Sequence, residues 1–110
     1  MGEDLIFYDT SVWVALTVPG DRKGPQAKGL QAKVTRGAFG AIVTTSFVLD
    51  EAATFVRMET DTESAARLLR SILASAAITT VWIDPGHFES ALDLFQSHRD
   101  KHWSLTDCTS

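Results

Sequence analysis

Three short apolar runs divide the chain, at residues 5–8, 41–44 and 78–83. Because these runs lack regular alternation with polar residues, they are typical of strands in a parallel sheet that is covered on both faces. We therefore expect these three segments to form the sheet of the domain.

Helical patterns lie between these runs. Apolar residues recur at three- and four-residue spacing in residues 65–73 and again in residues 88–95. The second segment follows Asp84 and Pro85, a pair that commonly introduces a helix. Strands that alternate with helices in this way predict an α/β domain with right-handed crossover connections.

Two further segments have helical character. Residues 45–58 have the pattern of a helix, with Thr45 or Ser46 as its N-cap. The apolar positions of residues 21–37 also keep a helical phase, but glycine and proline interrupt this stretch. We expect a regular helix in the first segment and a less regular one in the second.

The chain ends on a signal for a helix start. Ser104 and Asp107 form a capping-box pattern, yet only three residues follow Asp107. In an α/β domain, the helix that this pattern predicts would lead to another strand. We therefore expect residues 1–110 to be a single domain that forms the N-terminal portion of a larger α/β unit and lacks its last one or two strands.

Composition narrows the class of protein. Cys108 is the only cysteine, which excludes an internal disulfide and favours a cytoplasmic location. The N-terminus lacks the features of a signal peptide, and no apolar stretch is long enough to span a membrane. The net charge of -4 does not suit a dedicated nucleic-acid coat, although it allows a local basic face.

Asp9 is the first of three carboxylates that stand where α/β proteins commonly build sites. It follows the first predicted strand directly, and ligands of parallel sheets bind just beyond the carboxyl ends of strands. The alternative is that Asp9, Thr10 or Ser11 only caps a short helix that starts near Val12. Placement alone does not separate the two interpretations.

Glu51 is the second candidate, because it lies in an apolar helical stripe with Phe47, Val48 and Phe55. A carboxylate in such a stripe is costly unless it is paired or binds a metal. The alternative places Glu51 at the edge of the stripe, solvated or paired with an arginine. Asp50 is the competing acid, and its face of the helix is less apolar.

Asp107 is the third candidate, although as the acid of the terminal capping box it also suits a purely capping role. Together, Asp9, Glu51 and Asp107 can converge at one end of the sheet. Clustered carboxylates repel one another and need cations, and hard oxygen ligands favour Mg²⁺ or Mn²⁺ over zinc. Such ions activate water and stabilise charge on a phosphoryl group.

The segments FYDTSVWVAL, IVTTSFVLDEAATFVR and WSLTDCTS resemble the motifs of the PIN-domain ribonucleases, especially the toxins of VapBC-type toxin–antitoxin pairs. The order of the three blocks and the spacing between them also fit this family, and the resemblance covers essentially the whole chain. It implies a three-layer α/β/α fold around a parallel sheet, in which the first strand lies between the second and the fourth.

The resemblance also implies roles for individual residues. Asp9, Glu51 and Asp107 would hold Mg²⁺ or Mn²⁺, and Ser11 would orient Asp9 or the attacking water. The implied reaction is hydrolysis of phosphodiester bonds in structured RNA, such as transfer or ribosomal RNA, which leaves a 5′-phosphate and a 3′-hydroxyl. The family usually acts as a homodimer and is blocked by a protein antitoxin.

The sequence departs from the family pattern at its C-terminal end. The family continues past the third acid through a helix, a fourth strand and a further acid, whereas this sequence stops at Ser110. Without that part, residues 5–8 would form an open edge strand with exposed apolar flanks. An inactive module that binds an antitoxin or RNA is therefore the alternative to an active nuclease.

Basic residues allow further interpretations. Residues 22–49 contain five basic side chains and no acid, which suits an RNA-backbone surface as well as a plain solvated helix face. A smaller basic cluster precedes Asp107, and an exposed helix end explains it more simply; its members are His98, Arg99, Lys101 and His102. These histidines and Cys108 lack the remaining features of a zinc site.

Aromatic residues and one further acid complete the candidates. Trp13 and Trp82 lie in apolar runs, which favours core positions, whereas Trp103 is a candidate for stacking on a base. Asp84, after the third strand, partly matches a phosphoacceptor receiver domain. However, Asp9 stands alone after the first strand and no lysine follows a late strand, so this class fits less well.

Overall fold

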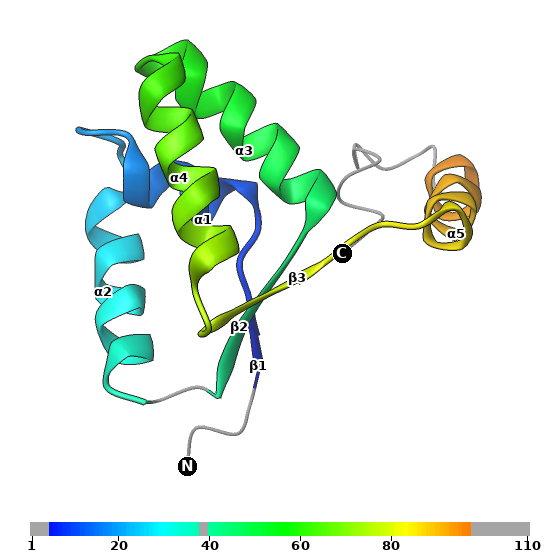
Figure 1. Ribbon diagram of the computed structural model, residues 1–110, viewed down its shortest axis with the longest axis horizontal. Coiled ribbons are helices and arrows are strands. Elements are labelled where there is room, and N and C mark those ends of the chain that lie inside the picture. The colour runs from blue at the N-terminus through cyan, green and yellow to red at the C-terminus, as the bar shows by residue number, and fades with distance from the viewer. Residues whose placement is uncertain (1–4, 38–39, 98–110) are drawn as a thin grey trace.

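The computed structural model describes residues 5–37 and 40–97 and arranges them as strands that alternate with helices (Figure 1). The elements are β1 (Leu5–Phe7), α1 (Thr10–Thr17), α2 (Gly24–Thr35), β2 (Ala41–Thr45), α3 (Ser46–Glu59), α4 (Thr62–Ala74), β3 (Ile78–Val81) and α5 (Pro85–Ser97). The expected α/β order is confirmed.

The strands form one parallel sheet in the order β1-β2-β3, so β2 lies in the middle of the described sheet. Ile42 of β2 lies opposite Ile6 on one side and Ile78 on the other. Only β2 is well covered. Within the described residues β1 and β3 are the outer strands and are less buried, and Leu5, Phe7 and Val81 are exposed, in line with the open edge expected for residues 5–8.

The helices cover the sheet in layers. In Figure 1, α2 and α4 lie to one side of the strands, whereas α5 lies to the other, beyond the end of β3. Helix α3 packs against α1, α4 and β2 and so ties the first half of the domain to the second. Helix α5 buries little beyond Ala91, and its Phe88 meets Phe47 of α3 edge-to-face, with ring centroids 5.9 Å apart.

The core forms where the end of β1 meets α1, β2, α3 and α4. Its buried side chains are Tyr8, Trp13, Ile42, Val48, Leu49, Ala52 and Ile72. The predicted core position of Trp13 is confirmed. The prediction for Trp82 is wrong, because this side chain follows the end of β3 at the outside of the described sheet and is 64% exposed.

Local sequence signals explain where the helices begin. Asp9, Thr45 and Asp61 cap α1, α3 and α4, each by accepting a hydrogen bond from a backbone N–H three residues later. Gly24 and Pro25, expected as interruptions, instead form the first turn of α2, where proline is well tolerated. None of the described helices combines the length and apolar character needed to cross a bilayer.

Candidate active site

Asp9 lies exposed at the end of β1 and also caps α1. Its Oδ1 accepts hydrogen bonds from the Val12 backbone N–H at 3.2 Å and from the Ser11 hydroxyl at 2.8 Å. The two interpretations of Asp9 are therefore compatible, since one carboxylate both caps the helix and stands at the sheet edge where sites form.

A buried hydrogen-bond chain fixes the backbone just before Asp9. The Trp13 indole N–H donates to the Thr44 hydroxyl at 3.1 Å, and that hydroxyl donates to the Tyr8 carbonyl at 3.0 Å. Because Thr44 belongs to β2 and Trp13 to α1, the chain joins three elements at the point where the strand turns into the helix. Asp9 therefore projects from a rigid corner.

The Tyr8 side chain supports the same corner from the other side. Its hydroxyl donates to Oε1 of Gln31 on α2 at 2.7 Å, and its ring contacts Trp13 edge-to-face at 4.9 Å between centroids. Burial raises the pKa of the Tyr8 phenol above its ordinary value of 10.0. The phenol therefore stays neutral and serves as a hydrogen-bond donor at neutral pH.

Glu51 is half-buried on α3 and lies against the start of α1. Its Oε1 accepts a hydrogen bond of 2.6 Å from the hydroxyl of Thr10, the residue that follows Asp9. The described residues thus give Glu51 a hydroxyl partner rather than an arginine. Since Val48 is buried while Phe55 is exposed, Glu51 lies at the edge of the apolar stripe.

The fold therefore brings two of the three candidate acids to one end of the sheet. Thr10 and Glu51 are 41 residues apart in sequence, and their contact places Glu51 beside the residue next to Asp9. Asp107 lies outside the described residues, and so do the basic cluster, Trp103 and Cys108. Ser11 contacts Asp9 directly.

These acids fit part of a metal site. Carboxylate oxygens are the donors that hard divalent cations prefer, and Asp9 and Glu51 supply them at the same edge. Within residues 5–37 and 40–97, however, no group of three or more His, Cys, Asp or Glu side chains gathers closely enough to hold an ion. The acid expected to complete the site, Asp107, falls outside these ranges.

The helix α2 and the loop before it carry five basic side chains. Arg22, Lys23, Lys28, Lys33 and Arg36 are all exposed. A hollow of about 140 Å³ lies between α1 and α2, and Ser11 and Lys23 both line it. One cation therefore shares a groove with the hydroxyl that contacts Asp9.

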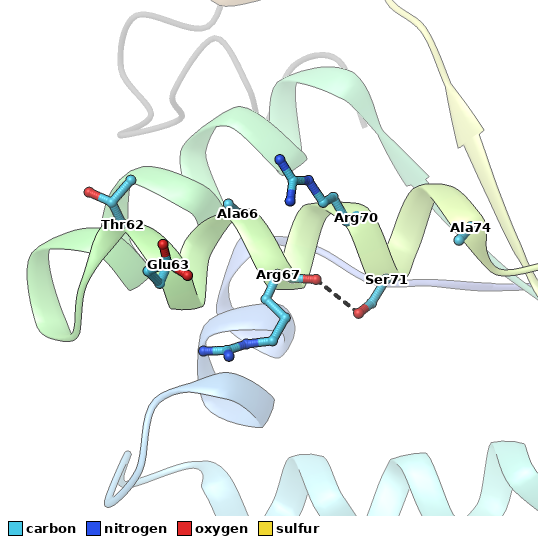
Figure 2. A pocket seen from close by; sticks show the side chains of 7 residues that line it. All are labelled: Thr62, Glu63, Ala66, Arg67, Arg70, Ser71 and Ala74. Carbon is cyan, nitrogen blue, oxygen red and sulfur yellow. Dashed lines mark hydrogen bonds between the residues drawn. The ribbon is translucent and has the colours of Figure 1, made fainter.

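A second hollow, of about 520 Å³, lies along the outer face of α4 (Figure 2). It is lined by Thr62, Glu63, Ala66, Arg67, Arg70, Ser71 and Ala74. Figure 2 shows Arg67 and Arg70 pointing in different directions from the helix, so the two cations do not converge on one ligand. Of the candidate acids that the structure describes, Asp9 and Glu51, neither lines this hollow.

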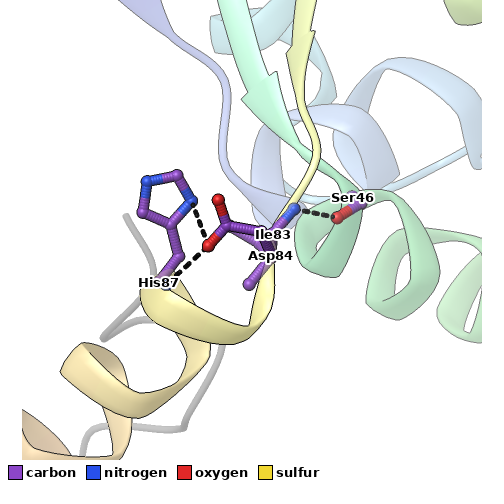
Figure 3. Close-up of polar contacts among 4 residues, drawn as sticks. All are labelled: Ser46, Ile83, Asp84 and His87. Carbon is purple, nitrogen blue, oxygen red and sulfur yellow. Dashed lines mark hydrogen bonds and ion pairs between the residues drawn. The ribbon is translucent and has the colours of Figure 1, made fainter.

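Asp84 is explained by helix capping (Figure 3). Its Oδ1 accepts from the His87 backbone N–H at 2.8 Å and lies 3.5 Å from Nδ1 of the same residue. Just before it, the Ile83 backbone N–H donates to the Ser46 hydroxyl at 2.9 Å, which ties the end of β3 to the start of α3. These contacts account for Asp84 without a phosphoacceptor role.

Comparison with known proteins identifies the family to which the chain belongs. The family profile of the PIN domain matches residues 6–110, and the chain therefore belongs to the PIN domain family. Within that family its structure is VapC-like. It is similar to the crystal structure of VapC20 from Mycobacterium tuberculosis, a toxin that cleaves the sarcin–ricin loop. The TM-score is 0.85 and the identity 26%, over 94% of this chain and 76% of that one.

A search among curated proteins gave no match. The PIN resemblance and the α/β/α fold class expected from the sequence are nevertheless confirmed by the family and structural matches. Sequence reasoning missed the role of Thr10, which it treated only as a candidate cap. Its place beside Asp9 was the one signal available, because the partner of its hydroxyl comes from a distant helix.

Proposed function

We propose that this protein is a Mg²⁺- or Mn²⁺-dependent endoribonuclease that cleaves structured RNA and acts as the toxin of a toxin–antitoxin pair. The observation that carries the proposal is the 2.6 Å contact between Thr10 and Glu51, which brings the second acid to the residue beside Asp9. Membership of the PIN domain family and similarity to an RNA-cleaving toxin support it.

Asp9, Glu51 and Asp107 are the residues that would hold the ion. When bound, a divalent ion supplies charge that offsets the negative charge developing on the phosphate and lowers the pKa of a nearby water. Ser11 and the Val12 amide fix Oδ1 of Asp9. These bonds orient the carboxylate before substrate arrives, which lowers the entropic cost of the reaction.

The surface next to these acids suits an RNA strand and protein partners. Lys23 shares the hollow between α1 and α2 with Ser11, and phosphate groups bind such exposed cations in a salt-dependent manner. Phe55 and Met58 of α3 expose apolar surface that a protein partner would bury. An antitoxin and a second copy of the chain are the partners that we propose, in the cytoplasm.

The Asp9→Asn variant tests this function. Asparagine caps a helix about as well as aspartate, so the fold should be kept while the negative charge is lost. We expect cleavage of a structured RNA in the presence of Mn²⁺ to fall at least about 100-fold, in the range of losses seen when one group that stabilises transition-state charge is removed. Gel analysis of end-labelled RNA measures it.

Asp61→Asn is the matched control for this experiment. Asp61 also caps a helix, since its Oδ1 accepts from the Ser64 backbone N–H at 2.7 Å, but it starts α4. Its variant should cleave RNA like the wild type. Undiminished cleavage by Asp9→Asn would contradict the proposed site.

An inactive binding module is the second candidate function. The observation that favours it is the exposed apolar surface of Phe55 and Met58 on α3, which a bound partner would cover. This module would bind an antitoxin or RNA with the same affinity in Mn²⁺ and in EDTA, and the wild-type protein would leave RNA intact. Gel-shift measurements under both conditions separate the two functions.

A further inference from the structure

We propose that Thr10 is a positioning residue, whose hydroxyl holds the carboxylate of Glu51 in place beside Asp9. The inference rests on the proposed function, because it assigns Thr10 to the same site. Thr10 touches neither ligand nor substrate in this role and acts through Glu51 alone.

The geometry of the contact carries the first step. The Thr10 hydroxyl lies 2.6 Å from Oε1 of Glu51, within the range of about 2.5–2.7 Å that is typical of hydroxyl donors to ionised carboxylates. Both residues are half-buried. Among the described residues, Oε1 is the oxygen of Glu51 that receives a hydrogen bond, so Oε2 stays available to a ligand.

The hydroxyl of Thr10 also differs from four hydroxyls that lie further along the described helices. Thr35, Thr54, Ser71 and Ser97 each donate to a carbonyl four residues earlier in their own helix. Thr10 is the first residue of α1 and instead donates to α3. This contact therefore sets the position of a side chain on another element.

Helix α1 gives this contact its stiffness. Thr10 is β-branched, so its side chain has few rotamers within a helix. The helix packs against α3, and its N-cap is Asp9. One rigid element therefore carries both the first acid and the hydroxyl that orients the second.

Variants that differ in the hydroxyl alone test the inference. Thr10→Val removes the hydroxyl and keeps the branched shape, whereas Thr10→Ser keeps the hydroxyl. Partners that orient metal-binding carboxylates are worth about 10–100-fold in metal affinity, and we expect Thr10→Val to weaken Mn²⁺ binding by that factor. Thr10→Ser should bind Mn²⁺ close to the wild-type value.

The measurement is titration of the full-length protein with Mn²⁺ alone, followed by the EPR signal of the free ion. Thr35→Val is the matched control, because its hydroxyl bonds within α2. Thr10→Ala is compared with Thr10→Ser in the same way, since alanine favours helix and preserves α1 if valine disturbs it. Urea unfolding verifies that each variant is folded.

The outcomes separate this inference from the proposed function. Wild-type affinity in Thr10→Val and Thr10→Ala, or equal weakening in Thr10→Ser, overturns the positioning role even where RNA is cleaved. Weaker Mn²⁺ binding restricted to the variants without a hydroxyl supports it, also where the wild type cleaves no RNA and the ribonuclease proposal fails. Absence of Mn²⁺ binding by the wild type overturns both.

Discussion

At the scale of single residues, the Asp9 carboxylate caps a helix and also belongs to the candidate site. Oδ1 is occupied by the N-terminus of α1, and the group as a whole is exposed at the end of a strand. Asparagine, serine and threonine also cap helices, so capping by itself requires no negative charge. The negative charge of Asp9 would therefore be required by the candidate metal site and not by the cap.

Asp61 shows how such a cap responds to pH. The Ser64 backbone N–H and then the Ser64 side chain hold the pKa of Asp61 below its ordinary value of 3.8. Its stabilising contribution is therefore present above that value and is lost as the pH falls through the lower pKa of the folded state. Asp61→Ala should be less stable than the wild type at pH 7, and the difference should shrink at the most acidic pH.

Urea unfolding of both proteins at a series of pH values measures this difference. Asp61→Asn is the control, because it keeps a capping oxygen that does not titrate. Its stability relative to the wild type should improve as the pH falls. A difference between Asp61→Ala and the wild type that is constant with pH would contradict the explanation.

Single residues were predictable from the sequence where the reason is local. The position of Asp9 after a strand and the caps at Asp9 and Thr45 follow from neighbouring residues. The contact of Thr10 with Glu51 was not predictable, because it depends on how two helices pack. Trp82 was misplaced because an apolar run does not reveal which strand lies at the outside of a sheet.

At the scale of elements, the corner between β1 and α1 is held by a buried side-chain network. Trp13 donates to Thr44, and Thr44 donates to the backbone of Tyr8, so strand, helix and neighbouring strand share two hydrogen bonds. Buried polar groups are costly when a partner is lost. The corner should therefore be sensitive to changes that spare the site itself.

Trp13→Phe tests this sensitivity. The variant removes the indole N–H from a side chain that is 5% exposed, and we expect the free energy of unfolding to fall by about 1–3 kcal/mol. Trp82→Phe, at an exposed position, should change it by less than about 0.5 kcal/mol. Urea unfolding followed by circular dichroism compares them, and similar losses in both variants would refute the role of the network.

The helices and strands were largely predictable from the sequence. The errors concern the start of α2 and the burial of the outer strands. Helical periodicity located α3, α4 and α5 because apolar faces repeat along them. In α2, Gly24 and Pro25 were taken as interruptions, although proline in a first turn needs no hydrogen-bond donor. The open edge at β1 was expected from the family resemblance, whereas the exposure at β3 was not, because no local pattern encodes strand order.

At the scale of the whole molecule, ion binding and folding are linked. An ion that binds only the folded chain stabilises it by about 2.7 kcal/mol at 100 times its dissociation constant. We therefore expect saturating Mn²⁺ to raise the midpoint of thermal unfolding and EDTA to reverse the effect. Asp9→Asn should show a smaller rise.

Asp50→Asn is the matched variant for this measurement. Asp50 is exposed and neighbours Glu51, so its variant removes a charge of the same helix without touching the candidate site. It should keep the full thermal response to Mn²⁺. An equal response in Asp9→Asn would place the ion elsewhere on the molecule.

The sequential neighbours Asp9 and Thr10 mechanically link the two acids. Because one helix end carries the first carboxylate and the anchor of the second, any displacement of α1 moves both together. Errors of about 1 Å in such positions cost roughly 100-fold in rate. A shift of α1 would therefore alter the positions of both carboxylates of the candidate site at once.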